Sequence, residues 1–291
     1  MYVAKKTQLF LPPYLLMDNA NVSVLIITLN EEHLVGRAIS SVLWSNDIVI
    51  VDSFSSDRTK EVALGYPHVR LFEKTFEDYS SQRNFGLHEI EYRNKWVFLL
   101  DADEICTPAL VHEMIDCAAN EDLKQPVFLI RRKDFFMNRW MRCHHPTWLE
   151  RLVRPNQVTF LGSVHERLSY SGIAGKLTGY IYHYPFDNGI EHWIARHNRY
   201  TTLSAALETA GTVKWGIRDL LSRDPLRRWR CIKEIYQKLP WRYLIYFFYR
   251  YIIKRGFLDG ICGLHFVLLE TFYHFTAVAK IRALKSNGRY K

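Results

Sequence analysis

The chain has 291 residues, of which 48% are hydrophobic and 24% are charged. This composition is that of a globular protein with a sizeable core, and it excludes a disordered chain. The net charge of +9 is unevenly placed, because residues 214–291 carry 17 Lys and Arg against 5 Asp and Glu. A negatively charged partner is therefore to be sought in the last third of the chain.

The five cysteines show no CxxC spacing, which favours a reducing compartment and predicts neither a disulfide framework nor a zinc site. Residues 1–20 are predicted to be a short leader that lacks the apolar core and cleavage site of a secretory signal. No stretch reaches the ~20 uninterrupted apolar residues of a membrane span.

Apolar runs rich in β-branched residues alternate with helical patterns in the first half of the chain. The helix after the first run is expected to begin with Asn30 as its cap, and Thr107 with Pro108 opens a later helix. This alternation predicts an α/β fold with a doubly wound, mostly parallel sheet over residues 21–190, followed by a helical segment over 191–291. The predicted strands are 22–29, 47–52, 69–72 and 96–100.

Polar residues follow three of these strands, at the edge of the sheet where ligands of such folds bind. They are Thr28, Asn30, Glu31, Asp52, Asp101 and Asp103. Two carboxylates one residue apart after a buried strand favour a divalent cation held by carboxylates and substrate phosphates. The alternative is a polar strand end beside a helix cap, without a ligand.

The sequence resembles a known family through motifs in a characteristic order. It is similar to family 2 glycosyltransferases with the GT-A fold, and within them to the bacterial branch that includes lipopolysaccharide-core β-glucosyltransferases. The motifs are ITLNEE (27–32), VDSFSSDRT (51–59), QRN (82–84), LDADE (100–104), RLVRP (151–155), GSVHE (162–166), HYPF (183–186) and KRGFLDGICG (254–263).

The resemblance implies roles for the residues at the strand ends. Asp101 would meet the donor ribose or the metal, and Asp103 would bind Mn²⁺ or Mg²⁺ at the diphosphate. Thr28, Asn30 and Asp52 would line the nucleoside pocket, with Glu31 beside them. Ser53 stands where many relatives carry a second acid, so the nucleobase stays open.

Further roles fall on residues outside the strand ends. Arg83 would lie over the diphosphate, since a guanidinium suits phosphate oxygens, and a solvated helix arginine is its alternative. Glu166 is the predicted catalytic base for an inverting displacement, with Glu150 as the second candidate. His165 would be a third metal ligand or would orient Glu166.

Histidines and tryptophans elsewhere in this half of the chain are further candidates. His183 is another possible metal ligand or a packed core residue. His144 and His145, with Trp140 and Trp148, predict either an acceptor-side loop or plain packing.

The last third combines apolar stretches at 241–253 and 257–279 with flanking basic clusters. This pattern favours helices lying in the headgroup region of a membrane, on its cytoplasmic face. Packing into the protein or a dimer interface, nucleic-acid binding and a hairpin through the bilayer are the alternatives. No nucleic-acid module accompanies the basic tail, so nucleic acid is not an expected partner.

The sequence thus predicts a metal-dependent inverting hexosyltransferase. It would use a nucleotide-diphosphate sugar resembling UDP-glucose, and act on a saccharide hydroxyl of lipopolysaccharide core or a related lipid-linked glycan. A sugar-nucleotide pyrophosphorylase is one alternative, although ITLNEE lacks the glycine-rich loop expected of it. A non-catalytic membrane-bound nucleotide-sugar or glycan binder is the other.

Overall fold

The computed structural model describes residues 21–144, 146–162, 166–209, 235–236 and 239–287. The chain forms two compact units, each built from two segments. The first comprises Met1–Arg132 with Trp148–Tyr182, and the second comprises Lys133–Thr147 with His183–Lys291.

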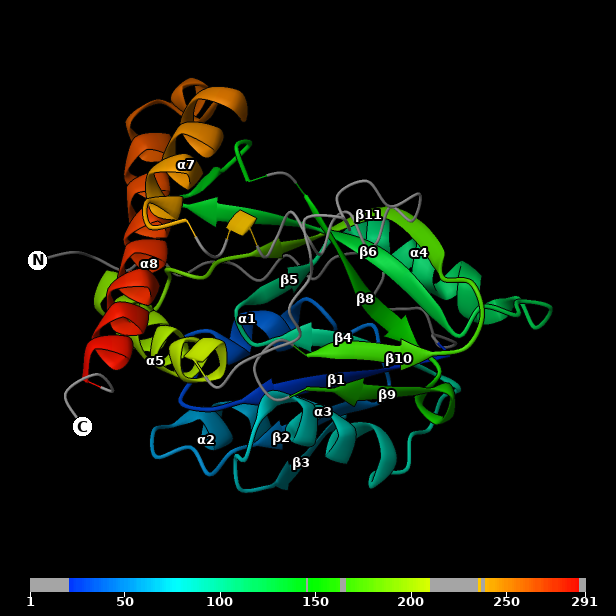
Figure 1. Ribbon diagram of the computed structural model, residues 1–291. Helices are drawn as coiled ribbons and strands as arrows, with labels where there is room; N and C mark the ends of the chain where they lie inside the picture. The colour runs from blue at the N-terminus through cyan, green and yellow to red at the C-terminus, as the bar shows by residue number, and fades with distance from the viewer. Residues whose placement is uncertain (1–20, 145, 163–165, 210–234, 237–238, 288–291) are drawn as a thin grey trace, which may run out of the picture. The chain divides into compact units, whose positions relative to one another are not determined.

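Four parallel strands form the centre of the first unit, in the order β3-β2-β1-β4 (Figure 1). They are β1 (Val22–Thr28), β2 (Ile48–Asp52), β3 (Val69–Glu73) and β4 (Trp96–Asp101). The sheet continues from β4 through β8, β6 and β11 to β5, and β8 pairs antiparallel with β4. The mostly parallel α/β fold predicted from the sequence is therefore confirmed.

The remaining strands are shorter or run from one unit into the other. They are β5 (Glu104–Cys106), β6 (Val127–Phe136), β7 (Arg139–Trp140), β8 (Thr147–Val153), β9 (Val158–Leu161), β10 (Arg167–Tyr170) and β11 (Gly175–His183), and the 3-10 turn η2 (Pro155–Gln157) precedes β9. Strands β9 and β10 form a separate antiparallel hairpin.

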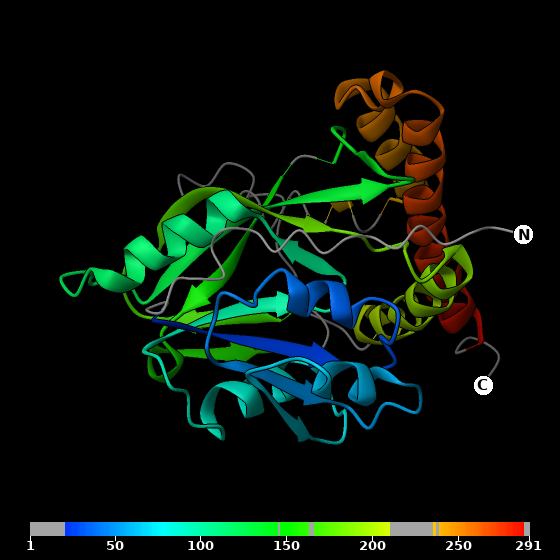
Figure 2. The ribbon, with the colours of Figure 1, turned by 180° about the vertical axis from the view of Figure 1, so that it is seen from behind.

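Helices cover both faces of the parallel strands (Figures 1 and 2). Side chains of α1 (Val35–Ser40), α2 (Thr59–Leu64) and α4 (Pro108–Ala119) share one core with alternate strand residues, including Ile26 and Phe98. The other strand residues pack on the side of α3 (Tyr79–His88). Because both faces are covered, the strands are continuous apolar runs.

One local prediction was wrong. Asn30 does not cap α1, because Leu34 occupies the N-cap position and Asn30 has a left-handed backbone with φ 56°. Asn30 instead belongs to the loop that follows β1 at the edge of the sheet. The prediction for Thr107 and Pro108 was correct, since they form the N-cap and first residue of α4.

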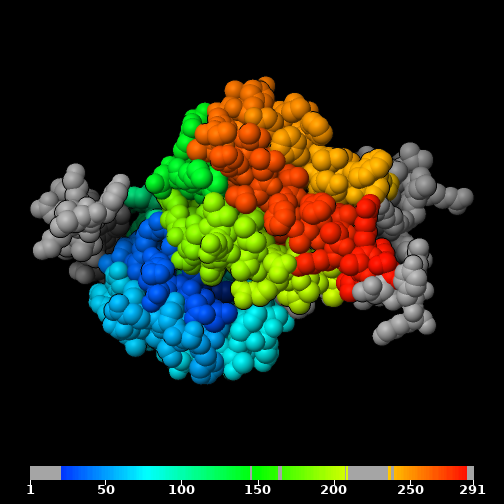
Figure 3. Space-filling model, turned by 90° about the vertical axis from the view of Figure 1, so that its left-hand side faces the viewer, coloured from blue at the N-terminus to red at the C-terminus, as the bar shows by residue number. Residues whose placement is uncertain are grey.

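The helical part of the second unit consists of α8 packed against α5 and α7. Figure 3 shows one face of it, where α8 runs between the other two. Lys280 of α8 donates to Asn198 O at 2.6 Å, and Tyr246 of α7 donates to Glu270 at 3.1 Å. The elements are α5 (Ile190–Thr209), α7 (Arg242–Phe248), a π-helical turn η4 (Tyr249–Ile253), a 3-10 turn η5 (Gly256–Asp259) and α8 (Gly260–Asn287).

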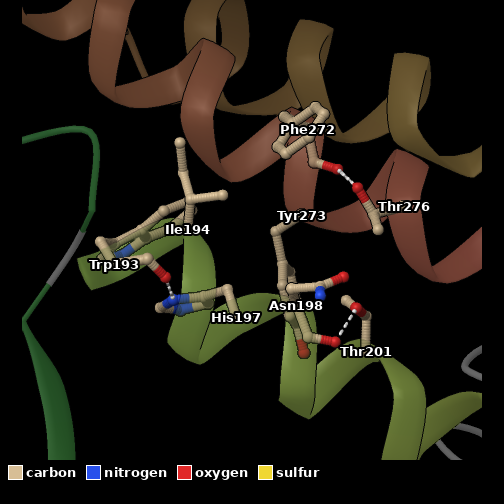
Figure 4. A pocket seen from close by; sticks show the side chains of 8 residues that line it. All are labelled: Trp193, Ile194, His197, Asn198, Thr201, Phe272, Tyr273 and Thr276. Atoms are coloured by element: carbon tan, nitrogen blue, oxygen red, sulfur yellow. Dashed lines mark hydrogen bonds between the residues drawn. The ribbon is translucent and has the colours of Figure 1, made fainter. Parts of the chain in front are cut away.

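A small cavity of about 70 Å³ lies between α5 and α8 (Figure 4). His197 stacks on Trp193 with ring centroids 3.8 Å apart and donates from Nδ1 to Trp193 O. Burial lowers the pKa of His197 to about 4, so its ring is neutral at pH 7. The lining is mainly aromatic and apolar, with a few amide and hydroxyl groups. It consists of Trp193, Ile194, His197, Asn198, Thr201, Phe272, Tyr273 and Thr276.

Candidate active site

The register of the parallel strands brings the predicted polar residues to one edge of the sheet. Thr28 pairs with Asp52, and Ile27 pairs with Asp101. Thr28 Oγ1 donates to Asp52 Oδ2 at 2.7 Å. These three strand ends therefore lie side by side, as expected for carboxyl ends of parallel strands.

Asp52 organises the loop that follows its own strand. Its carboxylate is buried and accepts from Ser55 N at 2.7 Å and from Ser55 Oγ at 2.6 Å, in addition to the Thr28 hydroxyl. Both carboxylate oxygens are therefore bonded within the protein, and Asp52 fixes the conformation of the loop.

The loops after β1 and β2 are bonded to one another. Asn30 N donates to Ser55 Oγ, and Asn30 Oδ1 accepts from Ser56 N, both at 2.8 Å. Glu31 N donates to Thr59 Oγ1 at 2.8 Å. The left-handed backbone of Asn30 directs its side chain into this network, so the two loops form one pre-organised rim.

Ser53, which stands in the place of a second acid, is bonded to helix α3. Gln82 Nε2 donates to Ser53 Oγ at 3.0 Å and to Lys74 O at 3.2 Å. The first residue of the QRN motif thus connects the loop after β2 to α3.

Arg83 joins two carboxylates that are far apart in sequence. Its Nη2 donates to Asp101 Oδ1 at 2.8 Å and its Nε donates to Glu166 Oε1 at 2.9 Å. The guanidinium also lies over the ring of Phe160, 5.5 Å from its centroid. Arg83 is buried, so the alternative of a solvated helix arginine is excluded.

A second arginine completes the cluster from the other side of Asp101. Arg151 Nη2 donates to Asp101 Oδ2 at 2.7 Å and to Glu104 Oε1 at 2.8 Å. Glu104 Oε2 in turn accepts from Asp101 N at 3.0 Å, and Arg132 Nη1 lies 3.7 Å from Glu104 Oε1. Opposite charges surround each carboxylate, as burial of ionised groups requires.

These contacts set the ionisation of Asp101. Burial by itself raises the pKa of a carboxyl group, but the guanidinium groups of Arg151 and Arg83 outweigh it and hold the pKa of Asp101 well below its usual range. Asp101 is therefore ionised at neutral pH.

The rest of the QRN motif explains how Glu166 reaches this cluster. Asn84 Nδ2 donates to Phe160 O at 2.9 Å, and Asn84 Oδ1 accepts from Phe160 N at 2.8 Å. Ser80 donates to Gly162 O, and His88 Nε2 lies 2.9 Å from Val158 O. Helix α3 is thus bonded to the β9–β10 hairpin, and Glu166 immediately precedes β10.

Several predicted residues can be placed relative to a possible metal. Asp103 is buried two residues beyond Asp101, whereas His165 lies outside the described residues. Within the described part of the chain, no three His, Cys, Asp or Glu side chains are grouped to hold a metal ion. Carboxylate oxygens such as those of Asp101 and Asp103 are the donors that Mg²⁺ or Mn²⁺ prefers, and such an ion often needs only one or two of them when phosphates complete its shell. In this structure both Asp101 oxygens accept hydrogen bonds from Arg83 and Arg151.

Among the described residues, Arg83 and Arg151 bond to Asp101, Glu104 and Glu166, and not to Glu150, the second candidate for the base. Glu150 precedes Arg151 on β8, and successive strand residues point to opposite faces. Burial and then the Glu150 carboxylate raise the pKa of Tyr170. The structure therefore joins Glu166, and not Glu150, to the Arg83–Asp101 cluster.

Two histidines of the second unit contact the same carboxylate. Asp134 Oδ1 lies 2.5 Å from His183 Nδ1, and the other oxygen contacts His144 Nδ1. His145 lies outside the described residues. Lys133 Nζ lies 4.4 Å from the ring centroid of Trp140.

Trp148, predicted with these residues, belongs to the first unit. Its partly exposed ring has Arg131 at 5.3 Å and Lys176 at 5.2 Å from the ring centroid.

Glu104, Arg151 and Gln82 are site residues to which the sequence motifs assigned no role. All three are polar side chains that the structure buries. Each stood inside a quoted motif, and a charged residue within a strand pattern is a signal that could have identified the first two.

A parallel α/β sheet that gathers carboxylates and arginines at its carboxyl edge is typical of α/β proteins that bind their ligands at this edge. More specifically, the chain belongs to glycosyltransferase family 2, because the model of Glycosyl transferase family 2 matches residues 23–180. The GT-A fold class predicted from the sequence is confirmed.

Relatives support this assignment over most of the chain. An uncharacterised glycosyltransferase of Rickettsia typhi is 27% identical, covering 92% of this chain and 89% of its own. The lipopolysaccharide core biosynthesis glycosyltransferase LpsC of Rhizobium meliloti is 34% identical over 106 residues, or 35% of this chain and 38% of its own.

Two solved structures are similar at low identity. S. aureus TarS 1–349 is 14% identical with a TM-score of 0.46, covering 92% of this chain and 91% of its own. The mannosyltransferase PcManGT of Pyrobaculum calidifontis, in complex with GDP-Man and Mn²⁺, is also 14% identical with a TM-score of 0.46, covering 91% and 86%.

Proposed function

We propose that this glycosyltransferase transfers a hexose from a nucleotide-diphosphate sugar, with inversion, to a saccharide hydroxyl. The observation that carries the proposal is the bonding of Arg83 to both Asp101 and Glu166. The buried guanidinium of Arg83 thereby joins two carboxylates. Asp101 lies at a strand end on the proposed donor side, and Glu166 is suited to act as the base.

The donor is proposed to lie along the rim formed by the loops after β1 and β2. Thr28, Asn30, Glu31 and Asp52 would shape the nucleoside side, because their hydrogen bonds hold these loops rigid. The diphosphate would lie toward Arg83, whose guanidinium matches phosphate oxygens. Pre-organisation of this kind reduces the entropy lost on binding.

Asp101 and Asp103 would hold a divalent cation, with His165 as a further ligand. Such a cation, when bound, stabilises the negative charge that develops on the leaving diphosphate. Arg83 and Arg151 would add positive charge beside this cation, since both are buried against Asp101.

Glu166 is proposed to accept the proton of the acceptor hydroxyl. Its Oε2 is buried and accepts no hydrogen bond from the described residues. The acceptor oxygen forms a bond to the anomeric carbon while the bond from that carbon to the diphosphate oxygen breaks. The electron pair leaves with the nucleoside diphosphate, and the proton ends on Glu166.

The acceptor is proposed to be lipopolysaccharide core or a related lipid-linked glycan, with the enzyme on the cytoplasmic face of the inner membrane. The partial similarity to LpsC supports this class of acceptor. The basic, apolar C-terminal part supports a membrane partner rather than nucleic acid. A UDP-glucose-like donor is the first to test.

The test compares two matched carboxylate variants in an assay of nucleotide release and sugar transfer with Mn²⁺. Glu166→Gln is expected to lower the transfer rate by about 10²–10⁴-fold while donor binding is kept. Glu150→Gln is the control and should transfer at nearly the wild-type rate. Equal activity of Glu166→Gln and the wild type would exclude Glu166 as the base.

A second comparison tests the metal and the rival functions. Asp103→Ala should abolish the stabilisation that Mn²⁺ and donor together give the wild type in thermal unfolding, since a ligand of the folded form raises apparent stability. A non-catalytic binder would show this stabilisation in the wild type but release no nucleotide.

A further inference from the structure

Large apolar side chains are exposed where α7 leads into α8. Six of them, within fourteen residues, are between 48% and 68% exposed. We call these six the apolar crest. They are Phe248, Ile252, Ile253, Phe257, Leu258 and Ile261.

The crest is held in a tightly built turn. Arg250 Nη1 donates to Cys143 O at 3.0 Å, and Asp259 Oδ2 accepts from Cys143 N at 3.1 Å. A Cβ at Gly263 would lie 2.2 Å from Gly256 O, so only glycine fits there. The fold therefore presents these apolar side chains outward in a fixed arrangement, instead of burying them.

Positive charge accompanies the crest. Arg255 is exposed between Ile253 and Phe257, and Lys254 Nζ lies 5.3 Å from the ring centroid of Tyr249. Residues 214–291 as a whole carry a net charge of +12. A second copy of this chain would bring like charges together, whereas an anionic lipid surface complements them.

The packing of α8 determines whether this helix crosses a membrane or lies on its surface. Within the described residues, Gly256–Ser286 is the one helical stretch long and apolar enough to cross a membrane by length and composition. It is, however, packed against α5 and bonded to it through Lys280, which donates to Asn198 and Thr202. A spanning α8 would draw the charged residues of α5 into the bilayer, where they are costly.

We propose that the apolar crest inserts into the headgroup region of an anionic bilayer while α8 lies on the membrane without crossing it. This inference deepens the membrane partner of the proposed function and rests on it for its biological meaning. Its residues belong to the second unit, so it can be tested apart from catalysis.

The experiment measures flotation of the full chain with vesicles of phosphatidylcholine plus phosphatidylglycerol, and with phosphatidylcholine alone. Leu258→Glu should lower the vesicle partition constant by at least about tenfold. The matched control is Leu64→Glu in α2, because Leu64 and Leu258 are both 61% exposed. The control should bind like the wild type.

A second variant guards against misfolding of the first. Arg255→Glu should weaken binding to the mixed vesicles by several-fold and leave binding to phosphatidylcholine alone unchanged. Bound wild-type protein should also be released by an alkaline carbonate wash, whereas retention in the membrane would indicate a spanning helix and overturn the proposal.

Two further outcomes would contradict the proposal that the apolar crest inserts into the membrane. Wild-type binding by both Leu258→Glu and Arg255→Glu would show that the crest is not the contact. Light scattering that shows an oligomer dissociated by Leu258→Glu, with vesicle binding intact, would make the crest an interface between copies. Nucleotide release depends on residues of the first unit and is measured separately. The proposed function and the membrane-insertion proposal can therefore fail independently of each other.

Discussion

At the scale of single residues, Arg83 uses two different nitrogens for two acceptors. Nη2 donates to Asp101 and Nε to Glu166, which is 83 positions away along the chain. A guanidinium can bind phosphate oxygens with the same groups. Donor binding and the position of the proposed base are therefore expected to depend on the same side chain.

Arg151 gives the sharpest stability prediction at this scale. Arg151→Met would leave the carboxylates of Asp101 and Glu104 without their shared partner in a buried site. We expect a loss of about 3–5 kcal/mol in the free energy of unfolding, measured by urea denaturation. Arg58→Met, which removes an exposed pair with Glu61, should leave the unfolding midpoint unchanged.

The lowered pKa of Asp101 predicts that the stability of the folded protein depends on pH. Its pKa lies well below the usual range in the folded protein, so the unfolded chain binds its proton more tightly. The stabilisation is present above about pH 4, the pKa of an unfolded Asp, and is lost as pH falls through the lower folded pKa. The stability difference between wild type and Asp101→Asn should therefore be constant near neutral pH and shrink below about pH 4. A difference that grows on acidification would contradict this.

At the scale of elements, α3 connects the parts of the site. Gln82 bonds to the loop after β2, Arg83 to the strand end of β4, and Asn84 to strand β9. Three successive residues can do this because the helix directs successive side chains about 100° apart. The short QRN motif thus positions three separate segments.

Asn84→Ala tests this connection. Loss of both bonds to Phe160 should loosen the β9–β10 hairpin and cost about 1–3 kcal/mol. We expect faster amide hydrogen exchange in 158–170 and a lower transfer rate, because Glu166 is no longer held in place. The control is Asn94→Ala, which removes side-chain bonds to Ser23 and Asn46. If the hairpin exchanged no faster in Asn84→Ala, the connecting role would be wrong.

At the scale of the whole molecule, charge is divided along the chain. The net +9 comes entirely from residues 214–291, since the preceding residues are slightly acidic. Raising the ionic strength from about 0.01 M to 0.15 M shortens the screening length from about 30 Å to 8 Å. Binding to anionic vesicles should then fall several-fold, while nucleotide release by the free enzyme changes little. Salt-independent vesicle binding would argue against an electrostatic contribution.

The sequence was sufficient for the parallel strands and the polar edge of the sheet. The predicted strand at 69–72 is β3 at Val69–Glu73, and the one at 96–100 is β4 at Trp96–Asp101. Such local elements can be read from periodicity because apolar runs buried on two faces have a distinct pattern. The position of Thr28, Asp52 and Asp101 at one edge then follows from parallel pairing alone.

Only the tertiary structure decided which distant groups meet. The contacts of Arg83 with Glu166, and of Arg151 with Asp101 and Glu104, join residues 47 to 83 positions apart. They depend on the insertion of β8 beside β4 and on the hairpin bonded to α3, and no local pattern specifies either. The same holds for α8, whose apolar sequence fits several environments. Its bonds to α5 and α7 decide which of its side chains are buried and which remain exposed, because burial is a property of packed segments and not of any one of them.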